Sequence, residues 1–138
     1  MEQIFEFIGN HPLLVGTLVA LVCALVITEM RKGGQGVTTQ QMTQLINSQG
    51  AIVVDVREKA DFGKGHIVDA VSMPFTKVKE RAAELNSHKE KPLIIVDAMG
   101  QHSGTVGKQF KEAGFTNVLR LKGGIGTWTA DGLPLVKK

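Results

Sequence analysis

The feature that most constrains this chain is an uncharged apolar run close to its N-terminus. Residues 13–28 read LLVGTLVALVCALVIT and contain no charged side chain. As a helix this run is about 24 Å long, close to the ~30 Å hydrocarbon core of a membrane. Pro12 suits the first helical turn, with Asn10 as the expected helix cap. We therefore expect residues 1–30 to form an anchor that is integrated in the membrane through residues 12–30.

The charges around this run set its expected orientation. Residues 1–30 carry three acids and no Lys or Arg, whereas all 16 basic residues lie in residues 31–138. Arg31 and Lys32 follow the run directly, and the positive-inside rule places that side in the cytoplasm. A cleaved signal peptide would begin with basic residues and end at a small-x-small site, which this chain lacks. We expect a single-pass protein with its N-terminus outside and its C-terminal part in the cytoplasm.

The composition excludes several kinds of site. The single cysteine, Cys23, makes no internal disulfide and supplies no Cys-based metal centre. An excess of six basic residues over residues 31–138 is too dilute for a nucleic-acid-binding surface. Gln109 and Thr129 break the phosphate-loop and dinucleotide-binding motifs, respectively. No two histidines have the i,i+4 spacing of a helical metal site, so we expect no nucleic acid, metal or cofactor.

The rest of the chain has the pattern of one α/β domain. Residues 31–36, RKGGQG, contain three glycines and no apolar side chain, which predicts a flexible linker before a domain at residues 37–138. Three apolar runs of strand length then alternate with helical segments. The strands are predicted at residues 51–56, 92–97 and 117–121, and the helices after a cap at Thr39, at 77–85 and at 104–113. This alternation is typical of a parallel sheet covered by helices on both faces.

Candidate site residues follow two of the predicted strands. In parallel sheets, ligands bind outside the carboxyl ends of the strands, which directs attention to residues 55–57 and 97–103. We expect Asp55 and Arg57 to form an ion pair that orients the first of these segments. Ser103 precedes a glycine at the start of a predicted helix, a position that favours an N-cap over a nucleophile.

Three segments, taken in order and spacing, resemble the rhodanese family. They read DVREKADFGKGHIVDAVSMP (55–74), PLIIVDAMGQHSG (92–104) and AGFTNVLRLKGGIGTWTADGLP (113–134). The resemblance covers essentially residues 37–136 and implies a five-stranded parallel sheet flanked by helices. The anchor before the domain resembles the single-span, rhodanese-like proteins of bacterial cytoplasmic membranes. The expected location is therefore the bacterial inner membrane.

The resemblance also directs attention to the loop after the fourth strand. In family members that act as sulfurtransferases, a cysteine heads this loop, and the loop amides favour a thiolate and hold a persulfide. The position that matches the cysteine is Asp97, and His102 stands where the family has an arginine. A carboxylate at this position can itself accept hydrogen bonds from the loop amides, as a built-in anion. The loop residues are Asp97, Ala98, Met99, Gly100, Gln101, His102 and Ser103.

These observations lead to an expected function and two alternatives. We expect a pseudoenzyme without sulfurtransferase catalysis, acting as a binding or scaffolding module for membrane or membrane-associated proteins, with a small anion as a second candidate ligand. The binding candidates are Asp97, Gly100, His102, Ser103 and Arg57. The first alternative is a sulfurtransferase that uses a partner's cysteine. The second is a hydrolase that uses Ser103 with His102.

Overall fold

The computed structural model of this chain describes the backbone of residues 1–32 and 34–137 and the side chains of residues 1–28 and 34–137. The chain falls into two compact units, Met1–Arg31 and Lys32–Lys138. The first unit contains the apolar run, and the second contains the predicted domain.

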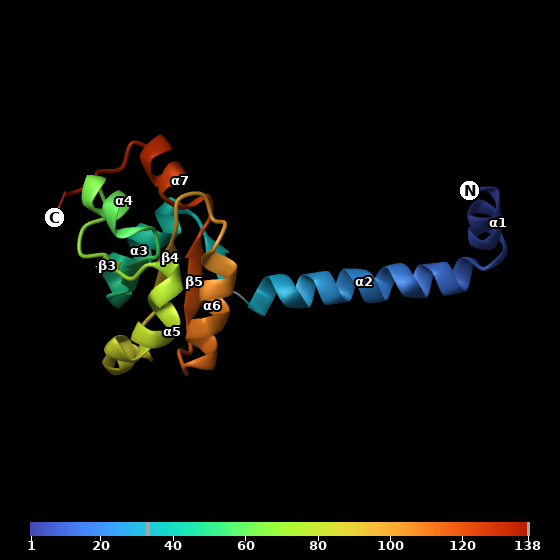
Figure 1. The fold of residues 1–138 in the computed structure, drawn as a ribbon, viewed down its shortest axis with the longest axis horizontal. Coiled ribbons are helices and arrows are strands. Elements are labelled where there is room, and N and C mark those ends of the chain that lie inside the picture. Colours follow the sequence, from blue (N-terminus) through green and yellow to red (C-terminus); the bar gives the residue numbers. More distant parts are fainter. Residues whose placement is uncertain (33, 138) are drawn as a thin grey trace. The chain divides into compact units, whose positions relative to one another are not determined.

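Two helices make up the N-terminal unit, α1 (Glu2–Asn10) and α2 (Pro12–Lys32), as Figure 1 shows. Pro12 opens α2 as expected, because proline has no N–H to donate and disfavours helical geometry at the residue before it. His11 accordingly adopts φ −129° and ψ 59° between the two helices. Asn10, which we expected to cap α2, is instead the last residue of α1.

The N-terminal unit presents apolar side chains along both of its helices. Phe5, Leu13 and Leu25 are among the exposed ones, at 68%, 85% and 65% of their surface. In the described part of the chain, no single helix has the length and hydropathy needed to cross a membrane. Helix α1 and residues Pro12–Thr28 of α2 meet that requirement together, as a pair bent by 98°.

A sheet of five parallel strands forms the centre of the second unit. The strands are β1 (Gln35–Val37), β2 (Ile52–Asp55), β3 (Val71–Ser72), β4 (Leu93–Val96) and β5 (Val118–Leu121). Their order across the sheet is β1-β5-β4-β2-β3, and every pairing is parallel. The three strands predicted from apolar runs are the central ones. The five-stranded parallel sheet that the family resemblance implies is confirmed.

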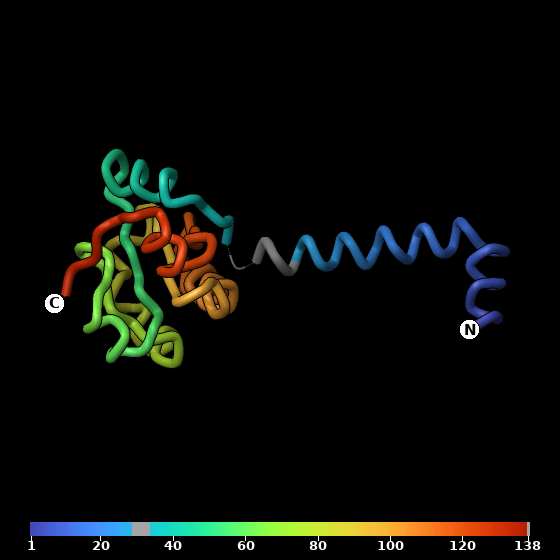
Figure 2. The backbone as a smooth tube through the Cα atoms, turned by 90° about the horizontal axis from the view of Figure 1, so that it is seen from above, coloured from blue at the N-terminus to red at the C-terminus, as the bar shows by residue number. Residues whose placement is uncertain are grey.

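Helices cover both faces of this sheet, as Figure 2 shows for α3 on one side and α5 and α6 on the other. The side chains of β4 alternate between two buried clusters, as they must in a strand. Leu93 and Ile95 pack with Phe110 of α6, and Ile94 and Val96 pack with the cluster that includes Met42 of α3. The helices are α3 (Thr39–Gln49), α4 (Lys59–Lys64), η1 (Phe75–Lys77), α5 (Val78–Arg81), η2 (Ala82–His88), α6 (Ser103–Glu112) and α7 (Gly124–Ala130).

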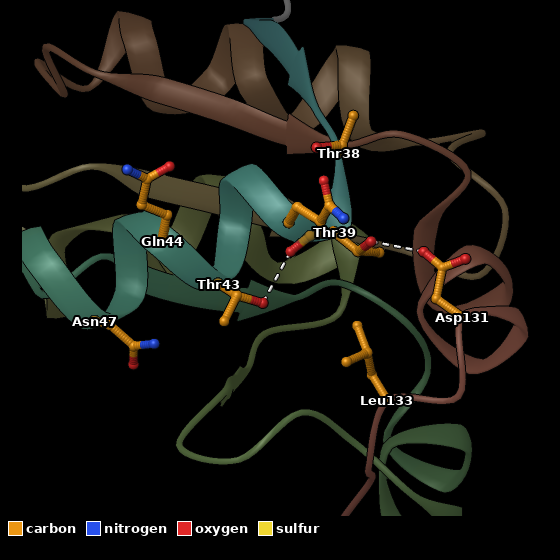
Figure 3. A pocket seen from close by; sticks show the side chains of 8 residues that line it. Thr38, Thr39, Thr43, Gln44, Asn47, Asp131 and Leu133 are labelled. Atoms are coloured by element: carbon orange, nitrogen blue, oxygen red, sulfur yellow. Dashed lines mark hydrogen bonds between the residues drawn. The ribbon is translucent and has the colours of Figure 1, made fainter.

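The cap of α3 lies one residue before the predicted one. The Thr38 hydroxyl accepts the Gln41 N–H at 3.2 Å, and the Gln41 side-chain oxygen accepts the Thr38 N–H at 2.9 Å, which makes a capping box. Thr39, the predicted cap, instead donates its hydroxyl to Asp131 Oδ2 at 2.6 Å, as Figure 3 shows. This bond joins the start of α3 to the residue that follows α7.

Two other segments also differ from the prediction. Strand β1 begins at Gln35, so the sheet starts inside residues 31–36, which we expected to be a linker. Its three residues gain their strand geometry from pairing with β5, which no local pattern reveals. The helix predicted over residues 77–85 is divided among η1, α5 and η2, with a non-helical residue, Leu85, at φ −105° and ψ 15°.

Candidate functional site

The candidate site is the loop of residues 97–103, which joins the end of β4 to the start of α6. Asp97 heads this loop and is buried, with 2% of its surface exposed. Its carboxylate accepts three backbone N–H groups of the same loop, from Gly100 to Oδ1, and from His102 at 2.6 Å and Ser103 at 3.2 Å to Oδ2. The loop therefore closes around its own carboxylate, as the built-in-anion hypothesis expects.

The start of α6 shows why Ser103 is not the helix cap that we expected. Asp97, which follows β4, supplies the acceptor for the N–H groups of the cap residue and of the first residue of α6. His102 occupies the cap position without a side-chain cap bond, and Ser103 is the first helical residue. The Ser103 hydroxyl donates instead to the carbonyl oxygen of Gly100 at 3.2 Å.

Helix α7 packs its N-terminus directly against the back of this loop. The N–H of Ile125 donates to the Asp97 carbonyl at 2.8 Å, and that of Gly126 donates to the Ala98 carbonyl at 3.1 Å. Gly124 lies at φ +61°, and a Cβ there would collide with the backbone of Asp97 and Ala98. Glycine at position 124 thus permits a backbone approach that a side chain would block.

The outer rim of the loop is aromatic and apolar. The His102 ring stacks on Phe75 with centroids 4.1 Å apart and planes 2° from parallel. Met99 is 72% exposed, and Ala98 and Gln101 are exposed beside it. The position of Phe75 could not be found from local sequence, because it reaches the loop from η1, a segment more than 20 residues before the loop in the chain.

Asp55 and Arg57 form the predicted ion pair. Arg57 Nη2 lies 2.7 Å from Asp55 Oδ2, and its Nε contacts both carboxylate oxygens at 3.0 and 3.1 Å. The same Nη2 donates to the Gly65 carbonyl at 2.7 Å. His66 follows, 4% exposed, with Nδ1 3.0 Å from the Phe62 carbonyl and its ring stacked on Phe62. These contacts hold the segment after β2 in place.

A separate hollow of about 800 Å³ runs along α3, and Figure 3 shows its polar lining. Thr39 donates to Asp131, and the Thr43 hydroxyl donates to the Thr39 carbonyl at 2.9 Å, so part of this lining is engaged within the protein. The hollow does not include the loop of residues 97–103. Among the described residues, no group of three or more His, Cys, Asp or Glu side chains is arranged to hold a metal ion.

Comparison with known proteins places this architecture in a family. A family model described as a rhodanese-like domain matches residues 38–131. The chain is 36% identical to protein YibN of Escherichia coli (strain K12), over 99% of both chains. It is 30% identical to a sulfurtransferase of Allochromatium vinosum, over 67% of this chain and 85% of that protein. The crystal structure of a rhodanese-related protein from Thermoplasma volcanium matches with a TM-score of 0.68 at 23% identity, covering 75% of this chain and 99% of that one. The chain belongs to the rhodanese-like domain family.

Proposed function

We propose that this protein is a membrane-anchored, cytoplasm-facing rhodanese-like domain that binds partner proteins and does not itself transfer sulfur. The observation that carries the proposal is the placement of the Asp97 carboxylate on the amides of Gly100, His102 and Ser103. In the family's sulfurtransferases these amides serve a cysteine and its persulfide. Here they already have an acceptor, and a carboxylate does not carry sulfane sulfur.

Cys23 does not supply the missing thiol in this proposal. It lies in α2, in the N-terminal unit, whereas Asp97 lies in the second unit. A thiol within the apolar run would sit in hydrocarbon, where the thiolate that attacks sulfur is strongly disfavoured.

The anchor is supported by the N-terminal unit itself. Helix α2 exposes apolar side chains along residues 13–28, and such a surface is stable in lipid. The identity to YibN extends over 99% of both chains, so it includes this unit. With Arg31 and Lys32 after the run, the proposed location is the bacterial inner membrane, with the domain in the cytoplasm. The tether would raise the local concentration of partners at that surface.

The rim of the loop is the proposed contact surface for a membrane or membrane-associated protein. Phe75, His102 and Met99 offer aromatic and flexible apolar groups, which are enriched where proteins bind one another. A hydrolase is less well supported, because the Ser103 hydroxyl donates to Gly100 while the His102 ring stacks on Phe75. In the described structure these two side chains therefore serve different partners.

Thiocyanate formation from thiosulfate and cyanide tests the absence of sulfur transfer. The purified full chain and its Asp97→Ala variant should both give only the uncatalysed rate. Sulfur transfer by the parent that is lost in Asp97→Ala would overturn the proposal. Transfer that appears only when a cysteine-containing partner is added would support the alternative in which the partner carries the sulfur.

The retained form of the loop is tested by Asp97→Cys in a Cys23→Ser background. The three amides should stabilise the thiolate. The pH dependence of the alkylation rate should therefore give a thiol pKa below that of an exposed control, Met99→Cys. Equal pKa values for the two thiols would show that the loop no longer favours an anion.

Orientation and partner binding are tested in cells. A reporter that is active only outside the cytoplasm, fused after Lys138, should be silent, and an active reporter would show the opposite orientation. A photo-crosslinking side chain at position 99 should capture partners in native membranes that one at Glu112, exposed at the far end of α6, does not. Identical products from both positions would argue against the rim as the contact surface.

A further inference from the structure

The two helices of the N-terminal unit meet almost at a right angle, with 98° between α1 and residues Pro12–Thr28 of α2. We propose that α2 crosses the inner membrane and that α1 lies flat on the side of that membrane that faces away from the cytoplasm. The apolar side of α1 is inserted at the boundary between lipid headgroups and acyl chains. This inference rests on the anchor proposed above. It assigns α1 one ligand, a zwitterionic lipid surface.

The residues of α1 divide cleanly between two sides of the helix. At about 100° per residue, the four large apolar side chains fall within an arc of roughly 160°, and the polar residues and Gly9 occupy the rest. The apolar side chains are Ile4, Phe5, Phe7 and Ile8, with exposed fractions of 58%, 68%, 53% and 45%. No residue of α1 is buried. A helix with one continuous, unburied apolar side is suited to lie along a surface and not to cross it.

The corner between the helices is a hydrogen-bonded structure. The His11 N–H donates to the Phe7 carbonyl at 3.0 Å, and the Val15 N–H donates to the His11 carbonyl at 3.1 Å. The rings of Phe7 and His11 lie 4.8 Å apart. Pro12 prevents a single continuous helix, since it has no N–H to donate and disfavours helical geometry at His11. If α2 stands along the membrane normal, this corner turns α1 parallel to the surface (Figure 1).

The length of the apolar run gives α1 a physical role. Residues 13–28 cover about 24 Å as a helix, roughly 6 Å less than a ~30 Å hydrocarbon core. A surface helix inserted by about 5–10 Å places its apolar side chains in the part of the hydrocarbon boundary that residues 13–28 do not reach. Two phenylalanines lie on the apolar side of α1, where surface helices commonly carry this residue.

The charges of α1 select the kind of lipid. Its polar side carries Glu2 and Glu6, and residues 1–30 contain no Lys or Arg. Surface helices that recognise anionic membranes carry basic residues on the polar side, which attract the lipid phosphates. Helix α1 lacks that attraction, so its binding depends on apolar insertion and suits phosphatidylcholine-like or phosphatidylethanolamine-like headgroups.

Spin labels on single cysteines can test this in the full chain. In a Cys23→Ser background, each residue from 2 to 10 is replaced in turn by cysteine, and the protein is reconstituted in phosphatidylcholine vesicles. Collisions with oxygen report lipid, and collisions with a polar nickel reagent report water. Positions 4, 5, 7 and 8 should be accessible to oxygen at one shallow depth, and positions 2, 3, 6 and 9 should be accessible to nickel.

Other patterns would overturn the inference. A label depth in the bilayer that increases steadily from position 2 to position 10 would show that α1 is part of a broken span. Uniform accessibility to nickel would show that α1 lies in water. Labels at positions 16, 20 and 25 test the anchor separately, because they should report deep lipid whatever α1 does. Adding phosphatidylglycerol to the vesicles should leave the α1 pattern unchanged, and a pattern that appears only with that anionic lipid would contradict the proposed headgroup preference.

A matched pair of variants adds a second measurement. Phe5→Ser removes an aromatic group from the apolar side, and Gln3→Ser makes a similar truncation on the polar side. Phe5→Ser should move a label at position 8 toward water, whereas Gln3→Ser should leave its depth unchanged. Equal shifts in the two variants would show that the apolar side does not hold α1 at the surface.

Discussion

The carbonyl oxygen of Asp97 accepts the N–H of Ile125 at 2.8 Å, while the carboxylate of the same residue accepts amides of its own loop. One residue thus joins two segments, the start of α6 on one side and the start of α7 on the other. The loop of residues 97–103 is therefore held from inside by a side chain and from behind by a helix.

Gly124→Ala should destabilise the domain by about 2–4 kcal/mol. A positive φ costs a side chain about 1–2 kcal/mol, and the new methyl group would also collide with the backbone of Asp97 and Ala98. Gly50→Ala is the matched control, since Gly50 lies at φ +64° and a methyl group added there would meet nothing within 4 Å. It should lose only about 1–2 kcal/mol. Urea unfolding measures both, and equal losses would contradict the close approach of α7.

Asp97→Ala should leave the loop amides without an acceptor and lower the free energy of unfolding by roughly 2–4 kcal/mol. Sulfate should then raise the melting temperature of the variant more than that of the parent, because the anion can accept the vacated N–H groups. Asp97→Asn keeps one acceptor oxygen without the charge and should respond to sulfate less than Asp97→Ala. Calorimetry with sulfate measures this, against chloride of equal ionic strength. Equal responses in parent and variants would rule out an anion-binding loop.

Arg57→Lys should cost about 1–3 kcal/mol, because an ammonium group cannot reproduce the contacts of Nε and Nη2 with Asp55 and Gly65. The Arg81–Glu84 pair provides a control on the surface. Arg81 Nε donates to Glu84 at 2.7 Å, which raises the pKa of Arg81 and lowers that of Glu84, and Arg81 Nη1 donates to the Ser72 carbonyl at 3.1 Å. The two side chains are 38% and 54% exposed, so solvent screens their pairing. Arg81→Lys should change the free energy of unfolding by less than about 1 kcal/mol.

A fragment of residues 32–138 should fold cooperatively without the N-terminal unit. Its core lies within that fragment, on both faces of the sheet. A fragment that starts at residue 37 should be less stable by about 2–3 kcal/mol, since it loses most of β1 and the bond from Arg120 to the Gly34 carbonyl. Thermal unfolding followed by circular dichroism compares the two. Equal stability would show that β1 contributes nothing to the sheet.

Local sequence was sufficient where burial on both faces imposes a continuous apolar run. Strands β2 and β4 read IVVD and LIIV, and such runs predict central strands of a parallel sheet. The same argument placed the candidate loop, because ligand sites lie beyond the carboxyl ends of these strands. The chemistry of Asp97 could also be anticipated, since a carboxylate that heads a turn of free amides is a suitable acceptor for them.

Tertiary structure alone decided the features that depend on contacts between distant segments. β1 and β3 read QGV and VS, which carry no strand pattern, and they exist because β5 and β2 offer them unpaired backbone groups. The acceptor at the start of α6 is Asp97 and not Ser103, because the carboxylate that follows β4 reaches the N–H groups of His102 and Ser103. The apolar run and the central strands could thus be predicted from the sequence, because burial selects apolar residues in each segment separately. The edge strands and the packing of α7 could not, because each depends on which distant backbone groups the fold brings within hydrogen-bonding distance.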